Sequence, residues 1–521
     1  MTTRLVVALS ALLLLLVRLP SLVQPMGADQ GLYAYVGDRI RAGQLPYRDA
    51  WDQKPPAIHY TYAALRTATP SDAAIPAADL IAAAAVAWLL YRLGASLTSP
   101  GAGALSALLF LLLSNPAFTR LAGVRLRAQC ETFIAVAIAA AILLLARSGG
   151  TRSTARSVAA GAFFGVAFLF KYNAVVYVAA GLVTLWIWRR LTVRDVQAIG
   201  AGFLVPVAAT LGIFAYGGSL RAMYDATVLY NMQYSGETYG GLAHFLRYLA
   251  TFPIQQARVD ALWTLGGAGC LILLPASLAQ RDRLVPIVWV AAACLSIAIN
   301  GSRGLPQYFV QANPALALAA GCAGALMWQR FRSTLGRMAR AAAAAGVLVI
   351  LVAVWRVNQF PKLIEQTVFD SRHALGWTER MEYLARYADD RKYSALAAAR
   401  LGELMRARSG PQDSVYVFGF SPAAYVHASR PSASRFFWSR PVIVQFNAGR
   451  PGYGSAGLLA DLSFAAPAVV ALQRHDWYPD VQDSADFFLA TAALADWLHT
   501  NYVRADGPDE FDVWVRRHPR P

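Results

Sequence analysis

The sequence is poor in charge and in cysteine. Charged residues make up 15% of the 521 residues and hydrophobic residues 57%, which excludes an ordinary soluble protein and indicates a polytopic membrane protein. The chain contains few cysteines, all in or beside apolar segments, and none lies in the last third, so no disulfide framework is predicted there. We interpret them as small buried hydrophobic residues; they are Cys130, Cys270, Cys294 and Cys322.

Long apolar runs provide the candidate membrane spans, because a spanning helix needs about 20 mostly apolar residues. They predict an α-helical transmembrane domain over residues 1–356 with about 11 helices. We expect no cleaved signal peptide, so the first run is a retained helix. The runs are Leu5–Leu19, Ala73–Leu93, Gly101–Ser114, Thr132–Ala146, Ser157–Phe170, Ala174–Trp188, Ala198–Tyr216, Ala261–Leu278, Leu284–Asn300, Tyr308–Trp328 and Ala339–Val354.

The formal net charge of +17 does not indicate a nucleic-acid partner, because the basic residues form no stripe or known module. They gather instead in alternate loops, which is the positive-inside bias. This bias predicts a cytoplasmic N-terminus, with loops 20–72 and 217–260 outside. We expect the membrane to be a bacterial inner membrane. The inside loops hold Arg92, Arg147, Arg152, Arg156, Arg189, Arg190, Arg194, Arg281, Arg283, Arg330, Arg332, Arg337 and Arg340.

The last part of the chain, residues 357–521, is less hydrophobic and mixes helical with strand patterns. It is expected to be an extracytoplasmic α/β domain. Helices are predicted over Trp377–Arg408 and Ser484–Tyr502, and strands over Ser414–Gly419, Pro467–Leu472 and Phe511–Val515.

The segment Asp29–Pro56 is the first place to look for chemistry, because it is charged and directly follows an apolar run. It contains Asp29 and Lys54, and also Asp38, Asp49 and Asp52, which are more often solvated charges or helix caps. Lysine is rare in this chain, so Lys54 and Lys171 are candidate compact charges for a phosphate. The alternative is that four lysines are too small a sample to interpret.

Further charged residues are expected at the outer ends of other spans. Glu131 opens one predicted span, Lys171 lies at the turn between two, and Arg303 lies in the loop before Tyr308. Cations and carboxylates gathered at one membrane face suit an anionic lipid headgroup together with a hydroxyl acceptor.

The order of these motifs resembles the GT-C glycosyltransferases, in the branch with the protein O-mannosyltransferases and the lipid A aminoarabinose transferase (family 39-like). That branch has an outside Asp, a Tyr, a Gly-x-x-Pro-Tyr and a Lys-Pro-Pro. Later it has an acidic residue, a small-residue helix ending in Lys, and a Tyr followed by Pro. The matching positions here are Asp29, Tyr33, Gly43 to Tyr47, Lys54 to Pro56, Glu131, Gly161 to Lys171, and Tyr308 to Pro314.

The resemblance implies transfer of a sugar from a polyprenyl-phosphate donor to a lipid, glycan or protein hydroxyl, with inversion. Gln30 stands where many members have Glu, so no metal ligand is predicted, although a divalent cation stays open. Leu32 stands near the position of the branch's Arg. The implied roles are Asp29 and Glu131 in catalysis; Lys54, Lys171 and Arg303 at the donor phosphate; and Tyr33, Asp52 and Tyr308 in substrate binding.

Two other functions stay open at this point. A transporter or flippase for a lipid-linked sugar would need polar residues in mid-membrane and broken helices, whereas the apolar runs carry almost no charge at their centres. A receptor or scaffold would leave the Asp29 segment unexplained. The sequence does not indicate which sugar or which acceptor is used.

Overall fold

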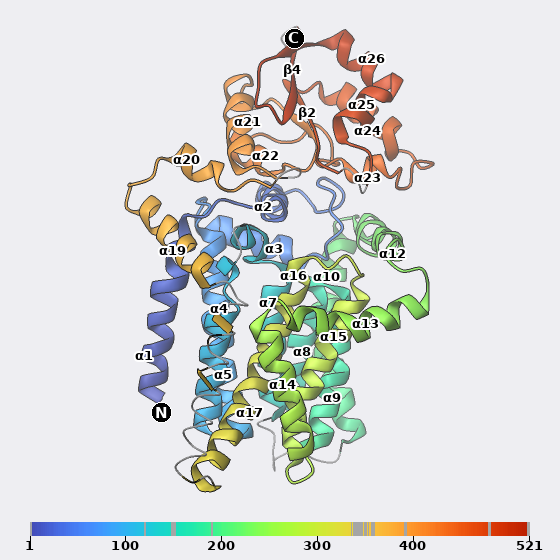
Figure 1. Cartoon of the computed structure of the whole chain (residues 1–521). Coiled ribbons are helices and arrows are strands. Elements are labelled where there is room, and N and C mark those ends of the chain that lie inside the picture. Colours follow the sequence, from blue (N-terminus) through green and yellow to red (C-terminus); the bar gives the residue numbers. More distant parts are fainter. Residues whose placement is uncertain are drawn as a thin grey trace. The chain divides into compact units, whose positions relative to one another are not determined.

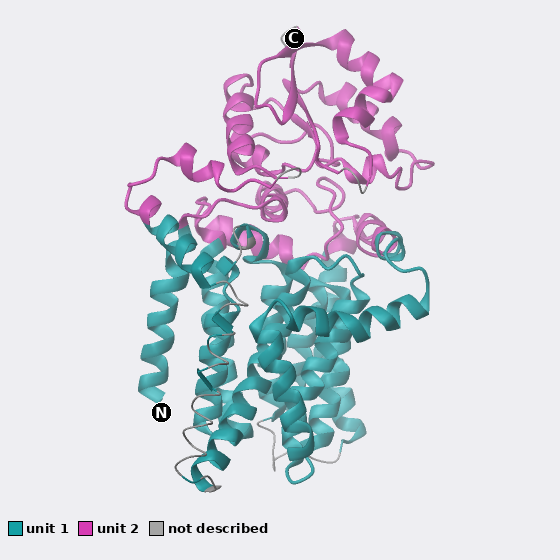
Figure 2. Ribbon diagram, viewed as in Figure 1, with its two compact units in different colours: residues 1–22, 76–213, 232–371 teal, residues 23–75, 214–231, 372–521 magenta. Residues whose placement is uncertain are grey.

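The computed structural model describes residues 3–118, 121–146, 153–188, 191–334, 360–389, 393–477 and 481–517, with a few single positions between 336 and 355. The chain divides into two compact units, coloured in Figure 2. Unit 1 consists of Met1–Leu22, Pro76–Ile213 and Met232–Ser371, and unit 2 of Val23–Ile75, Phe214–Asn231 and Arg372–Pro521. The predicted domain boundary near residue 356 stays a prediction.

Unit 1 is built almost entirely from helices (Figure 1). Five helical segments of the described residues are long and apolar enough to cross a membrane, or up to six if one bent pair counts as a single span. The five are Thr3–Val23, Ala74–Leu97, Val193–Tyr216, Arg281–Ile299 and Pro306–Ser333, and the bent pair is Leu242–Ala257 with Ala261–Ala276, at 113°. Shorter apolar helices are Pro100–Leu113, Cys130–Ala146, Thr154–Phe170 and Tyr172–Trp188.

These segments coincide with the predicted spans, with ends that differ by a few residues. One exception is Leu242–Ala257, which lies in the expected loop 217–260. The other is the predicted span Ala339–Val354, which lies largely outside the described residues. The helices of unit 1 are α1 (Thr3–Leu13), η1 (Leu14–Arg18), α4 (Ala74–Leu97), α5 (Pro100–Leu113), η3 (Pro116–Phe118), α6 (Ala122–Leu126), α7 (Cys130–Ala146), α8 (Thr154–Phe170), η4 (Tyr172–Val175), α9 (Val176–Trp188), α10 (Val193–Tyr216), α12 (Tyr230–Gly236), α13 (Leu242–Ala257), α14 (Ala261–Ala276), η6 (Arg281–Arg283), α15 (Leu284–Ile299), α16 (Pro306–Phe309), η7 (Val310–Ala312), α17 (Asn313–Thr334) and α19 (Phe360–Ala374).

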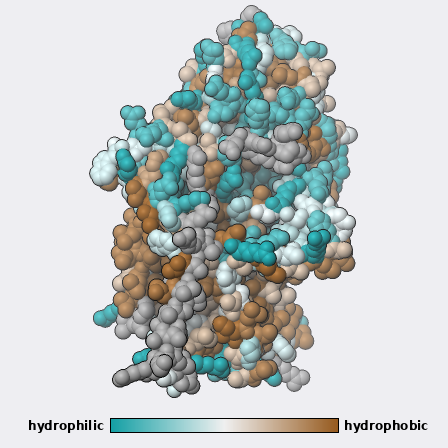
Figure 3. All heavy atoms as spheres, in the orientation of Figure 1, coloured by the Kyte–Doolittle hydropathy of each residue, from teal (hydrophilic) through white to brown (hydrophobic). Residues whose placement is uncertain are grey.

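Large apolar side chains are exposed along the spans of unit 1. Leu15 and Leu16 at the end of the first helix are 55% and 60% exposed, and Leu204 and Val205 of α10 are 59% and 64% exposed. The face drawn in Figure 3 shows hydrophobic side chains over the long helices. Such surface is stable in lipid and costly in water, which makes the protein a multi-pass membrane protein.

Helices α8 and α10 approach each other closely through small residues. A Cβ added at Gly161 would lie 2.1 Å from the Ile199 carbonyl oxygen, and one added at Gly202 would lie 2.0 Å from the Val158 carbonyl oxygen. Small residues allow such backbone contact between membrane helices. This packing positions the end of α8, where Lys171 lies.

Unit 2 contains a small mixed sheet, as predicted for the C-terminal part, with strand order β1-β2-β4-β3. β1 (Tyr416–Phe418) runs parallel to β2 (Val469–Gln473), while β4 (Phe511–Arg516) is antiparallel to β2 and to β3 (Tyr502–Ala505). The fold class predicted from the sequence is therefore confirmed. The helices of this part are α20 (Arg380–Ala385), α21 (Ala395–Ala407), α22 (Ala423–Ala428), α23 (Arg440–Ile443), α24 (Gly454–Ala465), α25 (Ser484–Ala490) and α26 (Ala492–Asn501).

Some local predictions for the C-terminal part were wrong. The helix expected over Trp377–Arg408 is two helices, α20 and α21, because Ser394 caps a new helix by accepting a hydrogen bond from the Ala397 amide. The helix expected over Ser484–Tyr502 is also divided, since α26 starts anew after Thr491. β3 was not predicted.

The charged segment at residues 29–56 is half helical rather than a loop. It contains α2 (Ala28–Arg41) and leads to α3 (Ala57–Ala68), after the short η2 (Leu19–Val23). α2 packs on α22, since a Cβ added at Gly31 would lie 2.7 Å from the Ala423 amide nitrogen. The expected loop 217–260 is likewise mostly helical, with α11 (Leu220–Tyr224), η5 (Asp225–Leu229), α12 and α13.

Candidate active site

In unit 1, three of the predicted site residues come together. Glu131 lies in the first turn of α7, and Lys171 is the residue at which α8 ends. Lys171 Nζ donates to Glu131 Oε1 over 2.5 Å and lies 4.5 Å from the centre of the Tyr308 ring. All three side chains are buried. The arrangement is a compact ion pair covered by an aromatic ring, in which the cation is stabilised by both neighbours.

A chain of hydrogen bonds fixes the helix that carries Tyr308. Gln311 donates from Nε2 to the Tyr308 carbonyl oxygen, and its Oε1 accepts from the hydroxyls of Tyr177 and Ser296, at 3.0 and 2.8 Å. Asn173 donates to the carbonyl oxygen of Ser296 over 2.7 Å. Fully hydrogen-bonded buried networks of this kind hold side chains in one arrangement, so the Tyr308 ring is fixed over Lys171.

Arg303 makes its contacts elsewhere in unit 1. Its guanidinium lies 3.6 Å from the centre of the Tyr234 ring. It donates to the Tyr234 carbonyl oxygen over 2.9 Å and to Glu237 over 3.0 Å. The sequence did not indicate these two partners, which lie about 70 residues earlier in the helical stretch that was expected to be a loop.

In unit 2, Asp29 and Tyr33 lie one turn apart on α2. Asp29 is in the first turn of this helix, where the helix dipole favours a carboxylate. Gln30, the departure from the family pattern, closes the helix start, because its Oε1 accepts from the Gly27 amide over 2.7 Å. The glutamine therefore has a structural part here as a capping residue.

Asp52 is buried beside a histidine that the sequence did not single out. His59 is fully buried on α3, and its Nε2 lies 3.2 Å from Asp52 Oδ2. The rings of Tyr33 and Tyr47 both lie edge-on to His59, with centroids 6.0 Å away. Asp52 Oδ1 also accepts from the Gln53 amide over 2.7 Å, and this hydrogen bond offsets part of the cost of burying the carboxylate.

The loop that carries Lys54 is fixed through its backbone. The Tyr47 hydroxyl donates to the Lys54 carbonyl oxygen over 2.8 Å, and Asn231 donates to the Gln53 carbonyl oxygen over 2.7 Å. The Trp438 indole donates to the Trp51 carbonyl oxygen over 3.1 Å. Tyr47 itself adopts a positive φ of 69°, which is rare for a bulky residue and is sustained only by surrounding contacts.

A buried charge cluster at the helix ends of unit 1 was missed by the sequence analysis. Asp79 of α4 lies 3.3 Å from Arg127 Nη1 and 3.9 Å from Arg18 Nη1. An ionisable residue inside an apolar run is the signal that could have found this cluster. It was overlooked because Asp79 lies near the start of its helix.

One buried acid of unit 2 has a perturbed pKa. Burial raises the pKa of Asp476 to about 7, against the lowering effect of hydrogen bonds from Ser484. Ser484 donates to Asp476 from its amide over 3.0 Å and from its hydroxyl over 2.6 Å. Within the described residues no three His, Cys, Asp or Glu side chains gather in a way that could hold a metal ion.

Part of the chain matches a known protein family. Residues 53–213 match the family model for dolichyl-phosphate-mannose-protein mannosyltransferases. No curated protein sequence matches the chain.

Solved structures match over nearly the whole chain. ArnT from Cupriavidus metallidurans bound to undecaprenyl phosphate is 16% identical, with a TM-score of 0.59, covering 99% of this chain and 98% of that one. Its apo state is 17% identical with the same TM-score and covers 98% of each chain. The Archaeoglobus fulgidus oligosaccharyltransferase tethered to an acceptor peptide is 11% identical, with a TM-score of 0.51, covering 98% of this chain and 74% of that one.

The ArnT-like fold of the whole chain and the mannosyltransferase signature of residues 53–213 agree with the resemblance found in the sequence. Residues 53–213 thus carry the signature of a mannosyltransferase family, on a chain that has the fold of ArnT.

Proposed function

We propose that the protein transfers a sugar from a polyprenyl-phosphate donor to an acceptor hydroxyl, with inversion at the anomeric carbon. The acceptor oxygen forms the new bond to that carbon while the bond to the phosphate oxygen breaks. Lipid phosphate leaves, and Asp29 takes the acceptor proton. A base in hydrogen-bond reach of the attacking hydroxyl contributes about 10²–10⁴-fold to such a step.

Lys54 is proposed to bind the lipid phosphate, and the way its loop is held is the observation that carries this function. The carbonyl oxygens of Gln53 and Lys54 are both fixed by side-chain donors, and Trp51 is fixed as well. A cation carried on a fixed backbone lowers the cost of organising the site when charge develops on the leaving phosphate.

Glu131 and Lys171 are proposed to support the site in unit 1. Lys171 contacts a carboxylate and an aromatic ring, so its charge is partly balanced before any phosphate binds. An ammonium group has three N–H donors, and one of them is given to Glu131. Lys171 therefore keeps donors for a phosphate oxygen, while Glu131 sets its orientation.

Arg303 is proposed as a further phosphate contact. A guanidinium has five N–H donors, and the contacts to Tyr234 and Glu237 use only part of them. Tyr33, Asp52 and Tyr308 are proposed to shape the substrate site. Asp52 acts there through His59 and the Lys54 loop rather than as a solvated charge.

We place the reaction at the extracytoplasmic face of a bacterial inner membrane, with the N-terminus in the cytoplasm. The described arginines support this orientation, because Arg92, Arg156, Arg194, Arg283 and Arg332 lie at or near helix ends that alternate along the chain. Arginine-rich loops stay on the cytoplasmic side.

The test is a donor-cleavage assay on the purified full chain in lipid nanodiscs, with radiolabelled polyprenyl-phosphate mannose and a cell-envelope extract as acceptor. We expect free polyprenyl phosphate and a labelled acceptor in equal amounts. A flippase would move the labelled lipid between leaflets and leave it intact, and that outcome would contradict the proposed transfer.

A further inference from the structure

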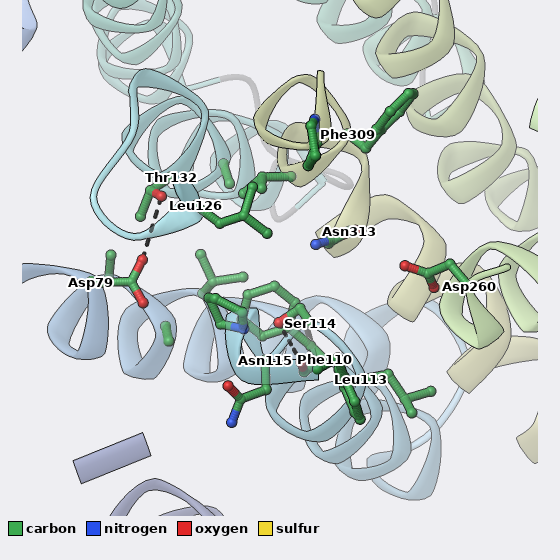
Figure 4. A pocket seen from close by; sticks show the side chains of 18 of the residues that line it. Asp79, Phe110, Leu113, Ser114, Asn115, Leu126, Thr132, Asp260, Phe309 and Asn313 are labelled. Carbon is green, nitrogen blue, oxygen red and sulfur yellow. Dashed lines mark hydrogen bonds between the residues drawn. The ribbon is translucent and has the colours of Figure 1, made fainter. Parts of the chain in front are cut away.

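A cavity of about 420 Å³ lies within unit 1 (Figure 4). Its lining comes from the ends of α4, α5, α7, α13 and α17 and from the segments between them. The volume falls within the range of about 300–1,000 Å³ that is typical of small-molecule sites. None of Glu131, Lys171 or Tyr308 lines it, but Thr132 and Phe309 do, so the cavity adjoins the ion pair described above.

One wall of the cavity carries charges that are already occupied by protein contacts. Arg18 donates from Nε and Nη2 to the Leu111 carbonyl oxygen and from Nη2 to the Ser114 hydroxyl. Asp79 accepts from the Ala128 amide over 3.1 Å and faces Arg18. This wall therefore contributes no uncommitted charge to a ligand.

The opposite wall carries polar groups that are available. Asp260 uses Oδ1 to cap α14 by accepting from the amides of Leu262 and Trp263. Within the part of the chain that the structure describes, its Oδ2 and the side-chain amides of Gln256 and Asn313 form no hydrogen bond. Figure 4 shows the Asp260 carboxylate and the Asn313 amide on the same side of the cavity.

The remaining walls are apolar and include three aromatic rings. Phe110, Phe118 and Phe309 line the cavity together with alanine, valine and leucine side chains. Aromatic faces beside a few convergent polar groups are the usual makeup of a site that binds an amphipathic ring.

The available groups select against a charged ligand. A phosphate would meet the carboxylates of Asp79 and Asp260, and the lining cation, Arg18, is already bound within the protein. A carboxylate accepts from hydroxyls, whereas an amide both donates and accepts. Sugar hydroxyls also do both, so they can satisfy all three available groups.

We propose that this cavity binds an uncharged sugar ring, with Asp260, Gln256 and Asn313 hydrogen-bonding its hydroxyls and the phenylalanines packing on its apolar face. This proposal deepens the proposed function, and it rests on that function for the role of the sugar as a substrate. The ring belongs either to the donor or to a glycan acceptor. In both cases the Glu131–Lys171 pair adjoins the site without lining it.

The direct test is saturation-transfer NMR on the full chain in nanodiscs, with methyl mannoside, methyl glucoside and methyl galactoside as probes. We expect at least one glycoside to bind, and Gln256→Ala with Asn313→Ala to weaken it roughly tenfold, since two neutral hydrogen bonds are lost. Neither substitution removes a hydrogen bond of the described structure, so both variants are expected to fold. Gln255→Ala is the matched control, because Gln255 neighbours Gln256 on α13 and is exposed.

Other outcomes overturn the proposal. They are binding of none of the three glycosides, binding that is unchanged in the double variant, and displacement of the glycoside by inorganic phosphate at equal concentration. Asp29→Asn separates this test from the proposed function, because it should lose sugar transfer and keep glycoside binding. If the wild-type protein showed no transfer activity, the proposed function would be contradicted. Glycoside binding to the cavity would still be tested, because it is measured independently of transfer.

The source of the sugar is identified with two lipids. If the cavity takes the donor sugar, the double variant binds polyprenyl-phosphate mannose more weakly and sugar-free polyprenyl phosphate unchanged. If it takes the acceptor glycan, the affinities of the double variant for both lipids stay the same while its methyl glycoside binding is weakened.

Discussion

Lys171 Nζ and Glu131 Oε1 lie 2.5 Å apart at the ends of two neighbouring helices, and both side chains are buried. Removing one partner of such a pair leaves an uncompensated charge, which costs about 3–5 kcal/mol. We expect Lys171→Met to lower the thermal unfolding temperature clearly, and the double variant Glu131→Gln with Lys171→Met to recover much of the loss.

A double-mutant cycle followed by thermal unfolding in detergent checks this coupling. Lys362→Met is the control, because Lys362 is exposed on α19, and it should change nothing. Losses that simply add in the double variant would show that the two residues act independently.

Asp29 is the position at which a conservative change should be most damaging to turnover. Asp29→Asn keeps the size of the side chain but cannot accept a proton, so we expect sugar transfer to fall by about 10²-fold or more. Asp38→Asn is the matched control on the same helix, because Asp38 pairs with Arg41 and Arg66, and it should keep most of the activity. Initial rates at saturating donor, with expression measured by fluorescence, give the comparison. Turnover that survives in Asp29→Asn would remove Asp29 from its proposed role.

The Lys54 loop offers a test of positioning. Tyr47→Phe removes the hydroxyl that donates to the Lys54 carbonyl oxygen, a hydrogen bond worth about 1 kcal/mol. We expect the KM for the donor to rise roughly fivefold and kcat to change little, whereas Lys54→Met should affect both. Tyr60→Phe serves as control, since the Tyr60 hydroxyl makes no hydrogen bond within the described residues. Equal KM values for the two tyrosine variants would argue against a positioning role.

Close packing of α8 on α10 should be sensitive to a single methyl group. Gly202→Ala would place a Cβ 2.0 Å from the Val158 carbonyl oxygen, and overpacking of this kind costs about 1–3 kcal/mol. Gly200→Ala, two residues earlier, meets nothing within 4 Å and should be neutral or stabilising by up to about 1 kcal/mol, because alanine favours helix. Thermal unfolding of the two variants is the measurement, and similar midpoints would exclude the close contact.

The raised pKa of Asp476 gives a pH-dependent stability. The folded state keeps the proton up to pH about 7, whereas an unfolded aspartate loses it near pH 3.9. The stabilisation is therefore complete below about pH 4 and is lost as the pH rises toward about 7.

Hydrogen exchange of peptides around Ser484, corrected for the intrinsic pH effect, should show protection that falls between about pH 4 and 7. In Asp476→Asn this fall should disappear, because no proton is lost from an amide. A fall of the same size in both proteins would assign it to another group.

Most spans could be predicted from the sequence, because a long apolar run in lipid must form a helix to satisfy its backbone hydrogen bonds. The α2 helix could not, because its charges resembled a loop. Its start signal was nevertheless present in Gly27 and Gln30, which form the cap. Where a helix packs on a protein surface rather than in lipid, hydropathy gives little indication of it.

The predicted site residues were found as separate positions, and their pairing depended on tertiary structure. Glu131 opens α7 and Lys171 closes α8, so two packed antiparallel helices bring them to the same end. No comparable rule predicts the contact of His59 with Asp52 or that of Glu237 with Arg303. Their contacts depend on turns in segments whose structure the sequence pattern did not determine.

The three-part makeup of unit 2 has a consequence for biosynthesis. Its first segment, Val23–Ile75, leaves the ribosome long before its last, Arg372–Pro521. The helix that carries Asp29 packs on α3 and, through Gly31, on Ala423, so the second of these contacts is missing during most of translation. A nascent chain that stalls after its spans are inserted would therefore expose the face of α2 around Gly31 to proteases and chaperones until residues 372–521 have been made.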